Sequence, residues 1–139
     1  MSRWMALDVG SKAIGIALTD PLNITVRPLT TLLRETIEKD TEHIFNMVQD
    51  HEIGKIIVGM PFRLEGNRSD ILDVIEPLVT KLRKILEIPV RWADESLSTK
   101  HAEKLMAQLG IPISQRRSKR NEFSAVVILQ WYLEESKPT

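Results

Sequence analysis

The sequence predicts an α/β fold in which a mixed β-sheet carries helices on both faces. In the first third of the chain, short apolar runs follow one another without a helical segment between them. Beyond residue 36, apolar runs alternate with segments of helical periodicity. An initial meander followed by this alternation is typical of a sheet whose later strands are joined by helical crossovers. No linker or low-complexity tract interrupts the 139 residues, so a single domain, 1–139, is expected.

The first three expected strands form the meander. Residues 4–9 and 13–19 are apolar runs separated by Gly10, Ser11 and Lys12, which predicts a hairpin. A third extended run covers about residues 25–32 and contains Pro28, which has no N–H to donate to a neighbouring strand. Proline is tolerated at the edge of a sheet, so this run is expected to be an edge strand.

Two further strands are expected later in the chain. Residues 55–61, "KIIVGMP", are a continuous apolar run that ends in Gly and Pro, which is typical of a strand buried on both faces. Residues 89–94, "PVRWAD", are the second of these strands.

Four segments have helical periodicity. They cover residues 36–52, 71–86, 98–109 and 123–133. Ser69 or Asp70 is a candidate N-cap for the second helix and Ser98 for the third. Pro77 lies inside the second periodic segment, which predicts a kink or a late start there.

Composition excludes several classes of protein. The chain has no cysteine, so disulfide frameworks, thiolate metal sites and cysteine catalysis are excluded. Apolar residues make up 42% and charged residues 27%, as in an ordinary globular protein. No apolar run approaches membrane-spanning length, and the first residues lack the order of a signal peptide. A cytoplasmic protein is therefore expected, with no membrane partner.

Positive charge is concentrated in one stretch although the net charge is zero. Residues 110–121, "GIPISQRRSKRN", hold Arg116, Arg117, Lys119 and Arg120 and no acidic residue. We expect this stretch to be a surface loop, and a basic run of this kind is either a solvated surface or a nucleic-acid contact.

Asp8 interrupts the apolar segment "MALDVGSKAIGIALTD" at residues 5–20. A carboxylate buried alone is costly, so it needs a metal, a cation or hydrogen-bond donors nearby. The strand at 89–94 runs into Asp94 and Glu95, and the strand at 55–61 runs into "GMPFRLEGNRS", which contains Arg63. The carboxyl ends of parallel strands share one edge, so we expect Asp8 and an acid of a neighbouring strand to converge there. Hard oxygen ligands without histidine or cysteine favour Mg²⁺ or Mn²⁺.

Four motifs together resemble one known family. "LDVGSKAIGIALTD", "IIVGMPFRLEGN", "DESLST" and "SAVVILQWYL" occur in that order over nearly the whole chain. They resemble the YqgF/RuvX family, small bacterial proteins described as candidate Holliday junction resolvases or pre-16S rRNA nucleases. The resemblance implies a ribonuclease-H-like fold, a five-stranded mixed sheet with helices on both sides.

The resemblance also implies the residues of a nuclease site. Asp8 matches the first acidic residue of the family, and Glu95 matches the acid of its "DE" motif. The third acidic position falls on Asn121, which brings no charge, and Glu122 is adjacent. Such a site would hydrolyse phosphodiester bonds with two cations about 4 Å apart. Asp8 would bridge them, Glu95 would hold one, and Asn121 or Glu122 would complete the shell of the other.

The implied partner is structured nucleic acid, either branched DNA or precursor ribosomal RNA. Its backbone would be held by six basic residues, namely Lys12, Arg63, Arg116, Arg117, Lys119 and Arg120. Cleavage of a junction would require a symmetric dimer, so a homodimer is a further expectation.

Several other interpretations stay open at this point. Asp8 could pair with Lys12 or accept hairpin amides, and Asp94 could have a structural role at its strand end. Asn121 could be an N-cap with Glu122 in the first helical turn. In that case the protein could be a nucleic-acid-binding or ribosome-maturation factor without catalysis. The first hairpin also looks like that of the sugar-kinase and actin group, but those proteins need two such domains to enclose ATP.

Overall fold

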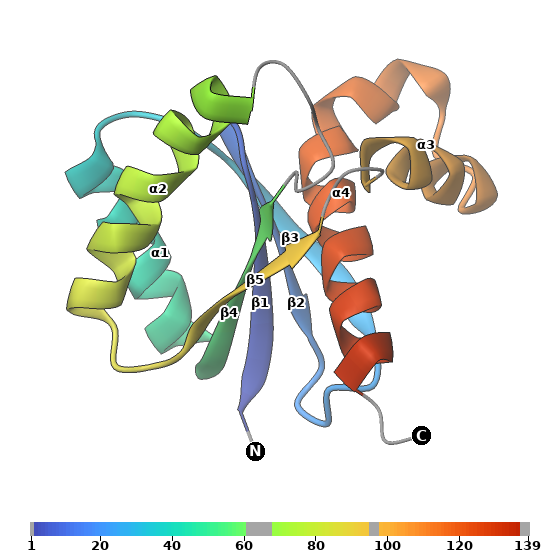
Figure 1. Cartoon of the computed structure of the whole chain (residues 1–139). Helices are drawn as coiled ribbons and strands as arrows, with labels where there is room; N and C mark the ends of the chain where they lie inside the picture. Colours follow the sequence, from blue (N-terminus) through green and yellow to red (C-terminus); the bar gives the residue numbers. More distant parts are fainter. Residues whose placement is uncertain (1, 61–67, 95–97, 137–139) are drawn as a thin grey trace.

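The computed structural model describes residues 2–60, 68–94 and 98–136, which form a sheet between two layers of helices (Figure 1). The strands are β1 (Arg3–Val9), β2 (Ala13–Thr19), β3 (Val26–Leu33), β4 (Ile53–Met60) and β5 (Val90–Asp94). Their order in the sheet is β3-β2-β1-β4-β5. The β1–β2 and β2–β3 pairs are antiparallel, and the β1–β4 and β4–β5 pairs are parallel. The expected meander, mixed sheet and edge strand are therefore confirmed.

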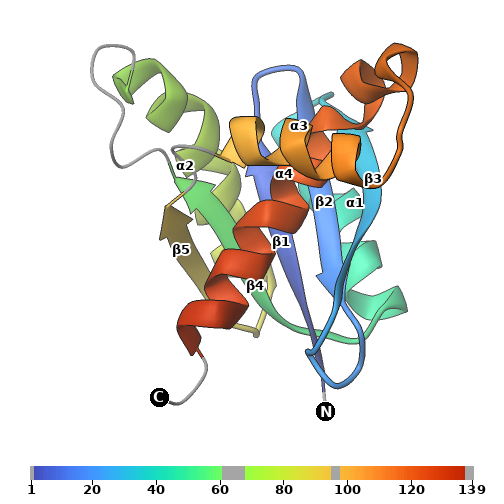
Figure 2. The ribbon, with the colours of Figure 1, turned by 90° about the vertical axis from the view of Figure 1, so that its right-hand side faces the viewer.

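Four helices cover the two faces of the sheet. They are α1 (Ile37–Asp50), α2 (Arg68–Ile85), α3 (Ser98–Gln108) and α4 (Ile113–Ser136). Helices α1 and α2 lie on one face, and α3 and α4 lie on the other (Figure 1). In Figure 2, α4 crosses the sheet from the side of β3 toward the side of β5. The expected α/β fold with helices on both faces is confirmed.

The strands supply two cores because successive side chains of a strand point to opposite faces. In β1, Met5 and Leu7 belong to the core under α1 and α2, whereas Ala6 belongs to the core under α4. The last five residues of β4, 56–60, are all buried, as expected for a strand covered on both faces. No helix in the described ranges is long and apolar enough to cross a membrane.

Two helices differ from the sequence expectations at their N-terminal ends. Helix α2 begins at Arg68, so Ser69 and Asp70 lie inside it and are not its N-cap. Pro77 also lies inside α2, where its ring nitrogen cannot donate to the carbonyl of residue 73. Helix α2 therefore begins before Pro77, and the late start that the proline allowed is not observed.

The larger difference concerns α4, which begins at Ile113 and not near residue 123. The stretch that we expected to be a basic loop is therefore the first part of a helix of 24 residues. Pro112 precedes it directly, where a missing N–H costs no intrahelical bond. Arginine, lysine and glutamine favour helix, which explains why a segment with few apolar residues can adopt it.

Candidate active site

The carboxyl ends of three strands meet at one edge of the sheet, as the sequence predicted. Strands β1, β4 and β5 run parallel, and they end at Val9, Met60 and Asp94. However, β4 lies between β1 and β5, so the strand ending in Asp94 is not the direct neighbour of the strand that carries Asp8. Two strand spacings, about 10 Å, separate them. Our expectation of neighbouring acidic strands was wrong in this respect.

Asp8 faces the layer of α3 and α4. It follows Ala6 by two residues, and Ala6 belongs to the core beneath α4. Its side chain is half-buried, and its partner across the β1–β2 ladder is Gly15. On the other side, Gly59 follows Val58, which pairs with Leu7. Because glycine has no side chain, neither neighbour of Asp8 in this row of the sheet carries a side chain.

Helix α4 passes directly over this row at Gly15. A Cβ atom at Gly15 would collide with the main-chain carbonyl of Asn121 and would lie 2.8 Å from the amide nitrogen of Glu122. The main chain of both residues therefore rests on the residue that pairs with Asp8. The fold thus places Asn121 and Glu122 beside the residue that pairs with Asp8, although more than a hundred residues of sequence separate them from Asp8.

Asn121 and Glu122 lie in the middle of α4, so the interpretation of Asn121 as an N-cap was wrong. Asn121 lines a pocket on the β3 side of the helix. Glu122 is half-buried, and burial raises the pKa of its carboxyl above the ordinary value, while the charge of Lys119 acts in the opposite direction. A cation placed beside this carboxyl group would favour its ionised form and would offset the effect of burial.

The donors at this position suit a hard divalent cation. Asp8 and Glu122 carry carboxylate oxygens and Asn121 an amide oxygen, which are ligand types that Mg²⁺ and Mn²⁺ accept. The contact of α4 with Gly15 is made by main-chain atoms, and Asn121 lines the pocket on the β3 side. Within residues 2–60, 68–94 and 98–136, no three residues of the types His, Cys, Asp and Glu are grouped so that they could hold a metal. Glu95, the predicted second acid, lies outside the described residues, and so does Arg63.

Asp94 differs from Asp8 in the face it occupies. It follows Trp92 by two residues in β5, and Trp92 packs against the core under α1 and α2. Alternation therefore turns Asp94 toward the layer opposite to Asp8. This orientation favours the interpretation in which Asp94 has a structural role at its strand end.

The basic residues of α4 have different surroundings. The Nε of Arg116 donates to the carbonyl oxygen of Ile111 at 2.9 Å, and the Nε of Arg120 lies 2.7 Å from a carboxylate oxygen of Glu103 on α3. Arg117 is exposed and lines the same pocket as Asn121. Lys119 is half-buried. The remaining predicted contact, Lys12, is exposed in the β1–β2 turn.

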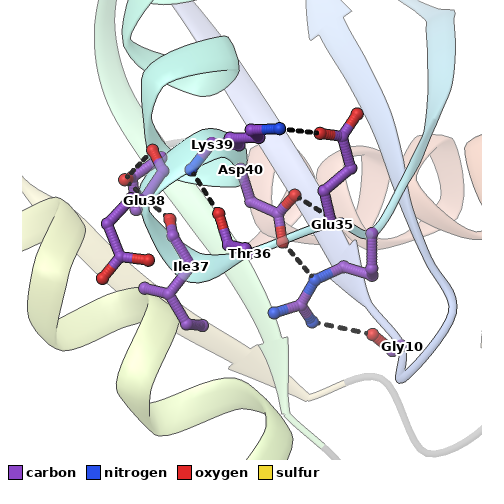
Figure 3. Close-up of polar contacts among 9 residues, drawn as sticks. Gly10, Glu35, Thr36, Ile37, Glu38, Lys39 and Asp40 are labelled. Carbon is purple, nitrogen blue, oxygen red and sulfur yellow. Dashed lines mark hydrogen bonds and ion pairs between the residues drawn. The ribbon is translucent and has the colours of Figure 1, made fainter.

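The sequence analysis missed a buried ion pair that supports the hairpin of Asp8. Asp40 on α1 is fully buried, and its carboxylate lies 2.7 Å from the Nε of Arg34 and accepts a hydrogen bond from the N–H of Glu35. A second guanidinium nitrogen of Arg34 donates to the carbonyl of Gly10 at 2.9 Å, and the main-chain N–H of Arg34 donates to the carbonyl of Lys12. Figure 3 shows Asp40 and Gly10 joined through this network.

One signal could have revealed this network. The buried positions of α1 include Ile44 and Val48, and Asp40 lies one turn before Ile44 on the same face. A carboxylate on the apolar face of an amphipathic helix needs a cation, for the same reason as Asp8. Nothing in the sequence, however, identifies Arg34 as the partner rather than another basic residue.

The chain was compared with known families, curated proteins and solved structures. The model of the RuvX family, described as Holliday junction resolvase, matches residues 2–135. A protein of Desulforamulus reducens named "Putative pre-16S rRNA nuclease" is 36% identical over 132 residues, covering 95% of this chain and 96% of the relative. A protein of Syntrophus aciditrophicus with the same name is 38% identical over 133 residues, covering 95% of this chain and 88% of the relative.

Two solved structures share the fold. T. thermophilus RuvC in complex with a Holliday junction has a TM-score of 0.64 at 14% identity, covering 98% of this chain and 97% of that chain. The Holliday junction resolvase of fowlpox virus has a TM-score of 0.57 at 11% identity, covering 96% of this chain and 99% of that chain. The predicted ribonuclease-H-like fold is thereby confirmed.

Proposed function

Because the chain belongs to the RuvX family, we propose that it is a metal-dependent nuclease that hydrolyses phosphodiester bonds in structured nucleic acid. The observation that carries this proposal is that the main chain of Asn121 and Glu122 lies against the row of the sheet that contains Asp8. Asp8 pairs with Gly15, and the main chain of Asn121 and Glu122 rests on that glycine. The names of the relatives favour precursor 16S rRNA as substrate, for which we propose processing of the 5′ end, and the resolvase name of the family favours a Holliday junction.

The residues of the site would have separate roles. Asp8, Glu95 and the Asn121–Glu122 pair would hold Mg²⁺ or Mn²⁺, with Asp8 in the centre. When bound, the metal would lower the pKa of a coordinated water and stabilise the charge that develops on the phosphate. The half-buried position of Glu122 supports its role as the carboxylate that replaces the missing third acid.

Binding of the substrate would rest on positive charge around the site. Lys12, Arg63 and the basic residues of α4 would contact phosphates, which fix the position of a nucleic acid without reading its sequence. Arg116 and Arg120 already have acceptors within the protein, so we assign the larger share to Arg117 and Lys119. We further propose that the chain acts as one domain in the cytoplasm, and as a homodimer if its substrate is a junction.

The test is cleavage of two labelled substrates, a four-way DNA junction and a precursor 16S rRNA terminus. Each would be incubated with Mg²⁺, with Mn²⁺ or with a chelator. Asp8→Asn should abolish cleavage while leaving the fold and the affinity for nucleic acid almost unchanged. Asp73→Asn is the matched control, because Asp73 is an exposed aspartate on α2, in the opposite layer. Cleavage by Asp8→Asn at the wild-type rate would rule out this site.

A second candidate function follows from the neutral side chain of Asn121. A site with one acid fewer than the family pattern could bind nucleic acid without cutting it. Binding without cleavage of either substrate, in any metal, would identify the protein as a binding factor. In that case Asn121→Asp is the informative variant, since a gain of metal-dependent cleavage would show that only the third acid was missing.

A further inference from the structure

A surface pocket of about 630 Å³ lies between the first turns of α4 and the strands β2 and β3. This volume is within the range of ligand-binding sites, roughly 300–1,000 Å³. Its strand side is formed by Ala13, Thr31 and Leu33. Its helix side is formed by Ser114, Arg117 and Ser118 together with Asn121 of the candidate active site. The pocket therefore adjoins the proposed site on the β3 side of α4.

The strand register connects this pocket to Asp8. Asp8 pairs with Gly15 in β2, and Gly15 pairs with Thr31 in β3. Residues directly opposite each other in antiparallel strands have side chains on the same face, so the three lie in one row beneath α4. Two strand spacings separate Thr31 from Asp8, which is about 10 Å.

The helix side of the pocket is suited to an anion. The side chain of Arg117 is exposed and forms no hydrogen bond or ion pair in the described part of the chain. Its neighbours Arg116 and Arg120, in contrast, use their Nε groups within the protein. Ser114 adds a hydroxyl group on the same side of the helix, whereas the hydroxyl of Ser118 donates to the carbonyl of Gln115 at 3.0 Å. Residues 113–121 contain no acidic side chain that could compete for Arg117.

The strand side of the pocket is mainly apolar and contains one polar group without a partner. Leu33 is 72% exposed, although it is a large hydrophobic residue. The hydroxyl of Thr31 is buried and has no hydrogen-bond partner among the described residues. The apolar residues of the strand side and the donors Arg117 and Ser114 of the helix side suit the two parts of a sugar–phosphate unit, whose sugar is less polar and whose phosphate is an anion.

We propose that this pocket binds the backbone of the substrate strand beside the cleavage site, with Arg117 as its phosphate contact. This inference rests on the proposed nuclease function, since it assigns the substrate at the same edge of the protein. The pocket adjoins the candidate active site through Asn121, so the contacted phosphate would lie close to the bond that is cut.

The first measurement is the affinity for a labelled four-way junction in the Asp8→Asn background, where the substrate stays intact. Adding Arg117→Gln should weaken binding several-fold and reduce the slope of log K against log salt by about 0.7 to 0.9, the contribution of one phosphate contact. Lys84→Gln is the control, because Lys84 is an exposed cation on α2 in the opposite layer. It removes the same charge and should change neither quantity.

The second measurement locates the contacted phosphate. Single phosphates of the junction would be replaced in turn by neutral methylphosphonates, and each junction would be bound by the proteins with and without Arg117→Gln. Neutralising the contacted phosphate should weaken binding by the protein that keeps Arg117 but have little further effect on the Arg117→Gln variant. The two changes would therefore be non-additive at that position alone. We expect that position to lie close to the cut, on the same strand.

The outcomes separate this inference from the nuclease proposal. Unchanged affinity and slope in Arg117→Gln, or additive effects at every phosphate, would overturn the pocket assignment. The loss of cleavage in Asp8→Asn would still stand in that case. If the wild-type protein neither binds nor cuts either substrate, the nuclease proposal itself fails, and the pocket assignment fails with it.

Discussion

Gly15 is the residue on which the geometry of the candidate site depends most directly. Its lack of a side chain lets the main chain of Asn121 and Glu122 lie against β2, in the row of Asp8. The contact is with main-chain atoms of a long helix, which cannot rotate away as a flexible side chain can. Any added atom must therefore displace α4 or bend the strand.

Gly15→Ala is expected to lower the free energy of unfolding by about 1 to 3 kcal/mol, the usual cost of overpacking a core. Urea denaturation measures this change. Cleavage should fall further than the loss of stability explains, because Asn121 and Glu122 move relative to Asp8.

Gly54→Ala is the control, since the added Cβ would meet only the side chain of Ser2 near the N-terminus, which can shift. Equal destabilisation by the two substitutions would contradict the role that we give to the contact between Gly15 and α4.

At the scale of single residues, the sequence identified candidate functional side chains better than it identified the residues that pack around them. Asp8 was recognisable because an isolated carboxylate in an apolar strand demands a partner, whereas the face of α4 beside it became known only from the structure. The role of Thr31 depends on a strand register that no local pattern contains. The same is true of Gly15, whose importance arises only from the helix above it.

At the scale of elements, the first turns of α4 show why a pattern of apolar residues is an incomplete guide. Residues 113–120 have almost no apolar periodicity, because all of them except Arg116 and Lys119 are exposed, with Ile113 at 79%. Arginine, lysine and glutamine give this segment its helical propensity. The contact of Arg120 with Glu103 on α3 stabilises the helix further. A signal based on burial could not detect a segment that is mostly exposed.

The junction of β3 and α1 supports the hairpin that carries Asp8. Arg34 is bonded through its guanidinium to Asp40 and to the carbonyl of Gly10. Arg34→Leu leaves the Asp40 carboxylate buried without its cation, and removing one partner of a buried pair costs about 3 to 5 kcal/mol. We expect a loss of that size in urea denaturation.

The double variant Arg34→Leu/Asp40→Leu distinguishes the effect of the charges from the effect of the side-chain volume that the pair fills. It removes both charges, so it should recover much of the stability lost by Arg34→Leu. Its cleavage rate should stay low nonetheless, because Gly10 still lacks the donor that holds the hairpin. Wild-type cleavage in this variant would mean that Arg34 has no part in positioning Asp8.

At the scale of the whole molecule, the sequence predicted the topology class but not the arrangement of the strands. The meander and the crossovers follow from the order of strands and helices, and both are confirmed. The position of β4 between β1 and β5 depends on which edge of β1 each crossover reaches, and local patterns carry no information about that. The distance between the acidic strand ends was therefore misjudged, although their common edge was correct.

The two cores share their strands, and this makes independent unfolding of the two layers unfavourable. Met5 and Ala6 are consecutive in β1, yet they belong to different cores. Loss of either helical layer would expose one face of all the central strands to water. We therefore expect the chain to unfold in a single cooperative transition, as one domain would.

The three tryptophans can test this, because they report on different layers. Trp92 packs against the core under α1 and α2, whereas Trp4 and Trp131 pack against the core under α4. Trp4→Phe/Trp131→Phe leaves only Trp92 as a reporter, and Trp4→Phe/Trp92→Phe leaves only Trp131. In each variant the urea midpoint from fluorescence should coincide with the midpoint from far-UV circular dichroism, which follows the helices of both layers. If fluorescence and circular dichroism gave separate midpoints within one variant, the two layers would unfold independently, and the single-domain proposal would be wrong.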